Sequence, residues 1–140
     1  MRDENQSVHL EQLLDRLRDR HAVIGIIGLG YVGLPLALRY AAEGFRVLGI
    51  DVDADKVARL NRGGSYIAHI GAAAIEAARA AGFMASTDFA RTGEADALII
   101  CVPTPLTAYR EPDLSFVTGT VESLLPHMRP GQLLSLESTT

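Results

Sequence analysis

The chain has 140 residues, 48% of them hydrophobic and 21% charged, with a formal net charge of −4. This size and composition suit one domain with its own core, and the acidic balance argues against a nucleic-acid partner or an anionic membrane surface. No apolar run approaches the ~20 residues that cross a bilayer, the polar N-terminus does not resemble a secretion signal, and a single cysteine excludes an internal disulfide. We therefore expect a cytoplasmic protein without a membrane partner.

The first predicted element is an amphipathic helix. Residues 1–7 are polar, and we expect a disordered tail there. Four leucines follow at the spacing of one helix face, at positions i, i+3, i+4 and i+7: Leu10, Leu13, Leu14 and Leu17. The spacing predicts a helix over residues 8–20 with Ser7 as its N-cap. We expect this helix to dock on the domain that follows, with a partner-binding helix as the alternative.

Apolar runs and helical patterns then alternate along the chain. The predicted strands span residues 21–27, 45–50, 83–86, 96–102 and 132–137. The predicted helices span residues 34–43, 53–61, 71–81 and 113–125. The first and fourth strands are apolar on both faces, as expected when helices cover both sides of a sheet. The pattern predicts an α/β class: a Rossmann-like, doubly wound parallel sheet of about five strands with an extra N-terminal helix, over residues 8–140.

A glycine-rich turn, GLGYVG, joins the first strand to its helix. Gly28 permits a tight turn, Gly30 would let a pyrophosphate approach the backbone, and Gly33 lets the helix pack close to the strand. The free N–H groups and the positive end of that helix would then face the phosphates. Because strand, turn and helix follow in the required order, we interpret this segment as a dinucleotide fingerprint.

Asp51 ends the second strand, about 20 residues after the first glycine of the turn. A carboxylate accepts hydrogen bonds from ribose hydroxyls and repels a 2′-phosphate, so Asp51 predicts NAD rather than NADP. We interpret the nearby Asp53 as a helix cap in preference to a ligand. Without further context, Lys56 is an exposed lysine of a first helical turn.

The other unusual segments also follow strands. Val102-Pro103-Thr104 comes after the fourth strand, and Glu137-Ser138-Thr139 comes after the fifth. In open α/β sheets, ligands bind outside the carboxyl ends of the strands, at the point where the strand order reverses. We therefore expect the cofactor at this edge of the sheet. The long connection over residues 103–114 has a length that is often functional.

Six segments carry a family resemblance. They are IGIIGLGYVGLPLAL, GIDVDADKVARLNRG, SYIAHI, ICVPTPL, REPDLS and LESTT, and they extend over nearly all of residues 23–140. Together they resemble the N-terminal NAD-binding domain of the UDP-glucose/GDP-mannose dehydrogenase family. SYIAHI and VPTPLTAYREPDLS are most similar to the branch that oxidises UDP-N-acetylglucosamine, or a related N-acetylhexosamine nucleotide, at C6. One departure is Ala68, where the family pattern has proline.

The resemblance implies a set of NAD contacts beyond the three glycines. These residues are Leu29, Tyr31, Val32, Asp51, Lys56, Val102, Pro103, Thr104, Glu137 and Thr139. Within the set, Asp51 and Lys56 would contact the adenosine ribose, and Thr104 would lie near the nicotinamide half. Thr139 would also have a catalytic role, because it resembles a threonine that helps to hold a catalytic water.

The resemblance also implies the chemistry of an enzyme. The family oxidises a primary alcohol to a carboxylic acid by two hydride transfers to two NAD molecules, with a cysteine-bound thiohemiacetal and thioester in the second step. Cys101 lies within an apolar strand and is not expected to be that nucleophile. The histidines show no metal-ligand spacing, so no metal is expected. We therefore expect the cofactor domain of a UDP-sugar dehydrogenase whose central and C-terminal domains are absent here. Self-association is expected at its last strand.

Two other functions stay open. A stand-alone NAD-binding module that senses redox state or regulates a partner would contain the same residues. A dehydrogenase of the 3-hydroxyacid type shares the glycines, but it usually carries GxMG in place of GYVG and lacks VPTP.

Overall fold

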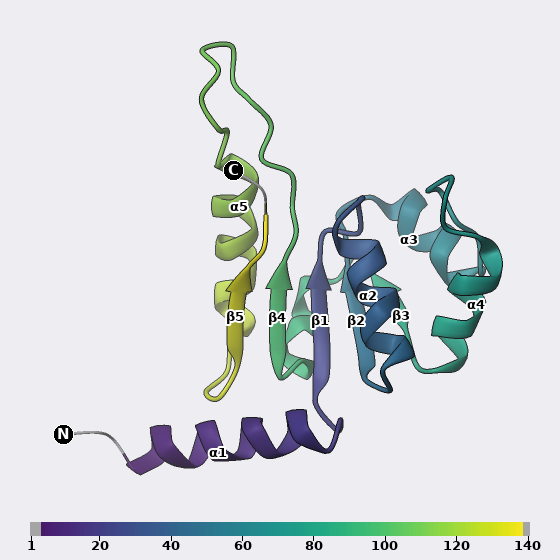
Figure 1. The fold of residues 1–140 in the computed structure, drawn as a ribbon. Helices are drawn as coiled ribbons and strands as arrows, with labels where there is room; N and C mark the ends of the chain where they lie inside the picture. Colours follow the sequence, from purple (N-terminus) through teal and green to yellow (C-terminus); the bar gives the residue numbers. More distant parts are fainter. Residues whose placement is uncertain (1–3, 139–140) are drawn as a thin grey trace.

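The computed structural model describes residues 4–138. Figure 1 shows the order of the elements along the chain. They are α1 (Glu4–Arg18), β1 (Val23–Ile27), α2 (Gly33–Ala42), β2 (Arg46–Ile50), α3 (Ala54–Asn61), α4 (Ala72–Ala80), β3 (Met84–Ser86), the short 3-10 helix η1 (Phe89–Glu94), β4 (Ala97–Ile100), α5 (Ser115–Leu124), the 3-10 helix η2 (Leu125–His127) and β5 (Leu133–Leu136). All five predicted strands and all five predicted helices are present, with bounds that differ by a few residues.

The five strands form one parallel sheet in the order β3-β2-β1-β4-β5. The chain moves outward from β1 to β3 and then crosses back to place β4 beside β1. The strand order therefore reverses between β1 and β4, where Ile26 of β1 is paired with Gly49 on one side and Ile99 on the other. The predicted α/β class and parallel sheet are confirmed.

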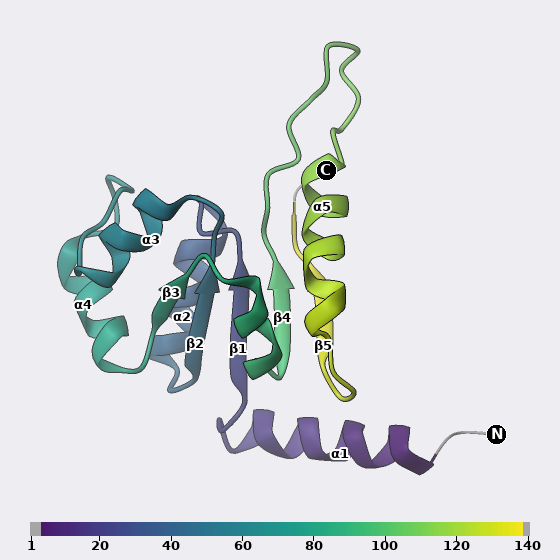
Figure 2. The same cartoon turned by 180° about the vertical axis from the view of Figure 1, so that it is seen from behind.

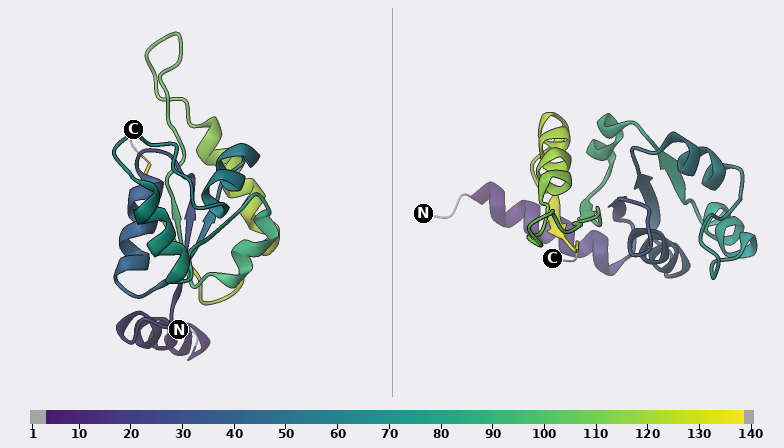
Figure 3. Two further views of the ribbon diagram at one scale, coloured as in Figure 1. Left: turned by 90° about the vertical axis from the view of Figure 1, so that its right-hand side faces the viewer. Right: turned by 90° about the horizontal axis from the view of Figure 1, so that it is seen from above.

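Helices cover both faces of the sheet, as Figures 2 and 3 show. Ile24 and Ile26 belong to a buried cluster that includes Leu34 of α2 and Leu60 of α3. Ile27 belongs to the cluster on the other face, with Leu124 of α5. Side chains of β1 thus enter both cores, and their alternation along the strand assigns neighbouring positions to opposite faces.

The helix α1 begins earlier than predicted. It starts at Glu4, so Ser7 lies inside the helix and is not its N-cap. A disordered tail is therefore wrong for residues 4–7, while residues 1–3 lie outside the described part of the chain. Residues 4–7 carry no apolar spacing that could indicate a helix, but glutamate and glutamine are good helix formers. An acid in the first turn also suits the positive end of the helix dipole.

A buried carboxylate attaches α1 to the sheet. Asp96, just before β4, accepts hydrogen bonds from the N–H of Val23 at 2.7 Å, from Arg16 of α1 at 3.0 Å and from Arg129 at 3.2 Å. Burial alone would raise the pKa of Asp96, but these bonds outweigh it and hold the pKa below its ordinary value. The helix is thereby fixed at the edge of the sheet opposite to the carboxyl ends of the strands (Figure 1).

The strand β5 forms an open edge. Among the described residues it pairs with β4 alone, and the side chains of Leu133, Leu134 and Leu136 are exposed. Its N–H and C=O groups on the outer side are therefore open to a further strand. The self-association expected at this strand stays a prediction.

Candidate functional site

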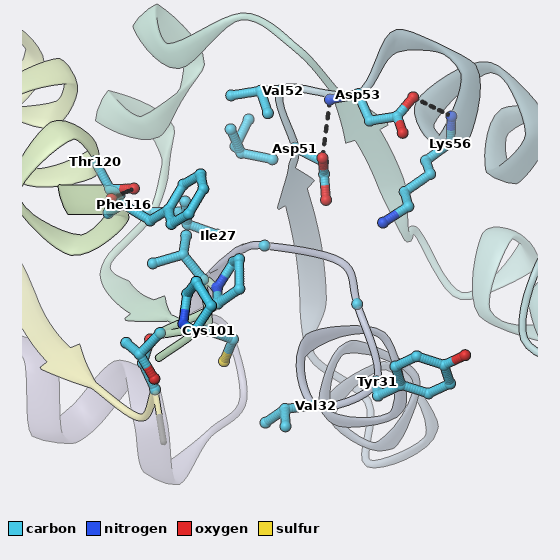
Figure 4. A pocket seen from close by; sticks show the side chains of 18 of the residues that line it. Ile27, Tyr31, Val32, Asp51, Val52, Asp53, Lys56, Cys101, Phe116 and Thr120 are labelled. Carbon is cyan, nitrogen blue, oxygen red and sulfur yellow. Dashed lines mark hydrogen bonds between the residues drawn. The ribbon is translucent and has the colours of Figure 1, made fainter. Parts of the chain in front are cut away.

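A cavity of about 690 Å³ opens at the carboxyl edge of the sheet, where the strand order reverses (Figure 4). Its wall combines the glycine turn, the residues after β2 and β4, and one face of α5. The lining residues are Ile27, Gly28, Gly30, Tyr31, Val32, Ile50, Asp51, Val52, Asp53, Lys56, Phe89, Cys101, Val102, Pro103, Thr104, Pro105, Phe116, Thr120 and Ser138. The wall is largely apolar with a few polar groups, and its volume falls in the range of small-molecule and cofactor sites.

The three glycines of the turn differ in the space that a Cβ atom would find. Gly28 has a positive φ of 94°, and a Cβ there would lie 2.7 Å from the carbonyl oxygen of Cys101. A Cβ on Gly33 would lie 1.7 Å from the carbonyl oxygen of Gly28, so α2 can approach β1 only with glycine at this position. A Cβ on Gly30 would meet nothing within 4 Å. The protein itself therefore does not require glycine at position 30, although a ligand against the backbone would.

The turn also presents unused hydrogen-bond donors. The N–H groups of Gly30, Tyr31 and Val32 donate no hydrogen bond to another residue within 4–138. They precede the ten-residue helix α2, whose first turn contains no acidic residue and whose N-cap position, Val32, offers no capping side chain. Free N–H groups and the positive end of a helix dipole together favour a bound anion. A pyrophosphate fits this donor set.

The Asp51 carboxylate lies at the end of β2, and each of its two oxygens accepts one hydrogen bond from the backbone. Its Oδ2 accepts from the N–H of Leu29 at 2.8 Å, and its Oδ1 accepts from the N–H of Asp53 at 2.9 Å. A carboxylate has about four acceptor sites, so each oxygen retains one for a ribose hydroxyl. The nearby Asp53 caps α3 through hydrogen bonds from the N–H groups of Asp55 and Lys56. Its predicted role as a cap is confirmed.

Lys56 extends over the cavity from the first turn of α3 (Figure 4). Its ammonium lies 5.4 Å from the centre of the Tyr66 ring, within the range of a cation–π contact. It is thus a positioned cation near Asp51. The prediction made without the family was an exposed lysine in a first helical turn. The first turn is correct, but the side chain is half-buried.

The segment after β4 closes the other side of the cavity. Val102, Pro103 and Thr104 all line it. The Oγ1 atom of Thr104 is buried and has no hydrogen-bond partner. Among the residues described, no other buried side-chain oxygen or nitrogen lacks a partner. Such an atom costs free energy unless something pairs with it. A ligand polar group in the cavity would supply the missing partner.

Three of the predicted contact residues that the structure describes do not line the cavity. Leu29 and Gly33 are buried behind it and shape the turn. Glu137 is exposed and accepts a hydrogen bond from the Ser135 hydroxyl, while the neighbouring Ser138 does line the cavity. Thr139, predicted as a catalytic residue, lies outside the described residues.

Cys101 lines the floor of the cavity but shows none of the features of a nucleophile. The side chain is buried, and burial followed by the charge of Glu137 raises the pKa of its thiol. A buried thiol with a raised pKa is mostly protonated and unreactive at neutral pH. This environment agrees with the expectation that Cys101 is not the nucleophile.

Sequence reasoning missed one wall of the cavity. This wall is formed by Val52, Phe89, Phe116 and Thr120. Figure 4 shows Val52 and Phe116 on the side of the cavity opposite to Tyr31. The residues come from three separate segments, so no motif joins them in the sequence. One signal was present, since Phe116 is an aromatic residue in the first turn of the helix after the VPTP segment.

Within residues 4–138, no group of three or more His, Cys, Asp or Glu side chains lies together in a way that could hold a metal ion. A membrane-spanning helix is likewise absent from this range, because no helix there has the required length and apolar character.

A parallel sheet whose order reverses at a glycine turn, with an acid ending the second strand, defines a dinucleotide-binding domain of the Rossmann type. The chain belongs to the UDP-glucose/GDP-mannose dehydrogenase family, whose NAD binding domain matches residues 22–140. Its cofactor is therefore NAD. The resemblance seen in the sequence is confirmed, and it begins shortly after the helix α1.

Comparison with known proteins leads to the same family. The chain is 40% identical over 121 residues to UDP-N-acetyl-D-mannosamine dehydrogenase of Escherichia coli strain K12, covering 85% of this chain and 28% of that protein. It resembles the solved UDP-N-acetyl-mannosamine dehydrogenase of S. aureus with a TM-score of 0.77 and 33% identity, over 85% of this chain and 29% of that one. NDP-N-acetyl-D-galactosaminuronic acid dehydrogenase from Methanosarcina mazei gives a TM-score of 0.77 and 32% identity, over 94% and 30%. The chain thus spans less than a third of each relative's length.

Proposed function

We propose that this chain is the cofactor domain of a nucleotide-sugar 6-dehydrogenase. The enzyme oxidises the C6 alcohol of a UDP-N-acetylhexosamine to the uronic acid in two NAD-dependent steps. The names of the relatives support an N-acetylhexosamine nucleotide as the substrate class, because they refer to N-acetylmannosamine and N-acetylgalactosaminuronic acid. The single cysteine, Cys101, is buried, so we propose that the chain does not complete the two-step reaction alone.

The observation that carries the proposal is the cavity at the reversal of the strand order, with an open backbone at Gly30. When bound there, NAD supplies the hydride acceptor. The free N–H groups of the turn hold its pyrophosphate, and the Asp51 carboxylate accepts from the adenosine ribose. Val52 and Phe116 on the far wall offer apolar surface to the adenine. The buried Thr104 hydroxyl faces the nicotinamide half.

The first test is a calorimetric titration of the chain with NAD and with NADP. We expect NAD to bind and NADP to bind much more weakly, because a 2′-phosphate would approach the Asp51 carboxylate. Asp51→Asn removes that charge while the amide oxygen retains one acceptor. The variant should bind NAD about tenfold more weakly, which equals about 1.4 kcal/mol, and should discriminate less against NADP.

A matched control is Asp53→Asn. It changes the net charge by the same amount two residues away, and asparagine caps a helix as well as aspartate does. If it alters the NAD-to-NADP ratio as much as Asp51→Asn does, the preference comes from general charge and not from a ribose contact. If a folded wild-type chain binds neither nucleotide, the proposed cofactor site is wrong.

A further inference from the structure

Leu29, within the glycine turn, is held through both of its backbone polar groups, which belong to the two successive peptide units on either side of its Cα. Its N–H donates to Oδ2 of Asp51 at 2.8 Å, and its carbonyl oxygen accepts a hydrogen bond from the hydroxyl of Tyr66. Tyr66 belongs to the connection between α3 and α4 and is not among the residues that line the cavity. Its segment, SYIAHI, has no role in the function described so far.

The hydroxyl of Tyr66 has a geometric effect on the neighbouring residue. The carbonyl of Leu29 and the N–H of Gly30 belong to one peptide unit, which is planar and trans, so the two groups point in opposite directions. Holding the carbonyl on the buried side therefore fixes the direction of the Gly30 N–H. That N–H is one of the unused donors of the turn.

The ring of Tyr66 has a second contact. Its face lies 5.4 Å from the ammonium of Lys56, which extends over the cavity. Burial, followed by the charges of Asp51 and Asp53, raises the pKa of the Tyr66 hydroxyl, which therefore stays protonated and able to donate at any physiological pH. One side chain thus connects the glycine turn with α3.

We propose that Tyr66 is a positioning residue of the NAD site, acting through two groups that it holds in place before the cofactor arrives. Its hydroxyl orients the peptide between Leu29 and Gly30 toward the pyrophosphate, and its ring orients the Lys56 ammonium toward the adenosine half. Preorganised donors bind more tightly because less freedom is lost on binding. The proposal rests on the proposed function, since it assumes that NAD occupies this cavity.

The first test separates the hydroxyl from the ring. Tyr66→Phe keeps the ring and removes the hydrogen bond. We expect its affinity for NAD to fall about fivefold to tenfold while its melting temperature stays near that of the wild type. Tyr40→Phe is the matched control, because Tyr40 is a half-buried tyrosine on α2 whose ring packs edge-on against Phe45. Its NAD affinity should not change. Equal NAD affinity for Tyr66→Phe and the wild type would overturn the role of the hydroxyl.

The second test is a double-mutant cycle on NAD affinity with Lys56→Met. If the ring positions the ammonium, Tyr66→Leu already removes the benefit of Lys56, so adding Lys56→Met to it should change affinity less than twofold. Added to Tyr66→Phe, which retains the ring, Lys56→Met should have its full effect. A purely structural role for Tyr66 would give the same Lys56→Met effect in both backgrounds, and that outcome would overturn the role of the ring.

The third test needs no nucleotide. Hydrogen exchange of the Leu29 amide in the free chain should be at least fivefold faster in Tyr66→Phe than in the wild type, with unchanged exchange in the strand β1. A uniform increase across the chain would assign Tyr66 to general packing and contradict the proposal. If the wild type does not bind NAD but Leu29 exchange responds as expected, the proposed function fails while the hold on the turn stands.

Discussion

At the scale of single residues, one glycine of the turn is required for folding and another only for binding. Gly33 has no room for a side chain, because the Gly28 carbonyl occupies the place of its Cβ. Gly30 has open space at the same atom. Two glycines three positions apart therefore have different physical reasons to be glycine.

This difference predicts that adding one methyl group impairs stability at Gly33 and NAD binding at Gly30. Gly33→Ala should lower the free energy of unfolding by about 3 kcal/mol or more, because the clash is with backbone and cannot relax easily. Gly30→Ala should stay within about 0.5 kcal/mol of the wild type but lose at least tenfold in NAD affinity. Urea denaturation and calorimetric titration of both variants give the two quantities. Equal destabilisation of the two would show that the steric reasoning is wrong.

At the scale of elements, α1 is attached to the domain by an ion pair as well as by the packing of Leu17 against the core. Arg16 contacts the buried Asp96, whereas Arg18 on the same helix pairs only with the exposed Asp15 at 3.7 Å. Hydrogen bonds to a buried carboxylate contribute more than exposed ion pairs. The ionic part of the attachment should therefore depend on Arg16 and not on Arg18.

Arg16→Met should lower the free energy of unfolding by about 1 kcal/mol at pH 7, and Arg18→Met should leave it nearly unchanged. Since the folded state lowers the pKa of Asp96, the contribution is fully present above the ordinary aspartate pKa. It is lost as the pH falls through the lower folded value. The difference between Arg16→Met and the wild type should therefore shrink below about pH 4. Denaturation curves between pH 7 and pH 3 measure it, and a constant difference would argue against a role for the Asp96 charge.

Sequence patterns predicted the elements better than the contacts between them. The strands and the glycine turn were recognisable because their signals are local: apolar runs, and three glycines directly after one of them. The apolar wall with Phe89 and Phe116 was missed because Phe89 lies in the connection from β3 to β4 and Phe116 in the connection from β4 to β5, and the two meet only in the folded domain. The start of α1 was missed because residues 4–7 carry no apolar spacing. The contact of Tyr66 with the turn joins positions 37 residues apart. Such a contact cannot be predicted from the spacing of apolar residues along the sequence.

At the scale of the whole molecule, the two edges of the sheet differ. The edge at β3 is a three-residue strand, whereas β5 presents exposed leucines and outer backbone groups. Exposed apolar edge strands favour pairing with another chain. Association of this chain should therefore occur at β5.

We expect sedimentation velocity to show association that increases with protein concentration. Leu134→Lys places a charge on the open edge and should reduce it strongly. The control is Leu125→Lys in η2, which lies away from the edge. It replaces a leucine that is more exposed than Leu134, and it should leave the association unchanged. A wild-type chain that stays monomeric up to about millimolar concentration would rule out this interface.

The hydrogen bonds of Asp51 also have a consequence for protein engineering. Cofactor preference in such folds is an attractive target for redesign, and the obvious change is to replace this carboxylate with a neutral or basic residue. Here the same carboxylate accepts from the backbone at Leu29 and Asp53. A replacement without acceptor atoms would therefore loosen the turn that must hold the pyrophosphate of either cofactor. Converting this protein to use NADP would require a second change that supplies a new acceptor for the Leu29 amide.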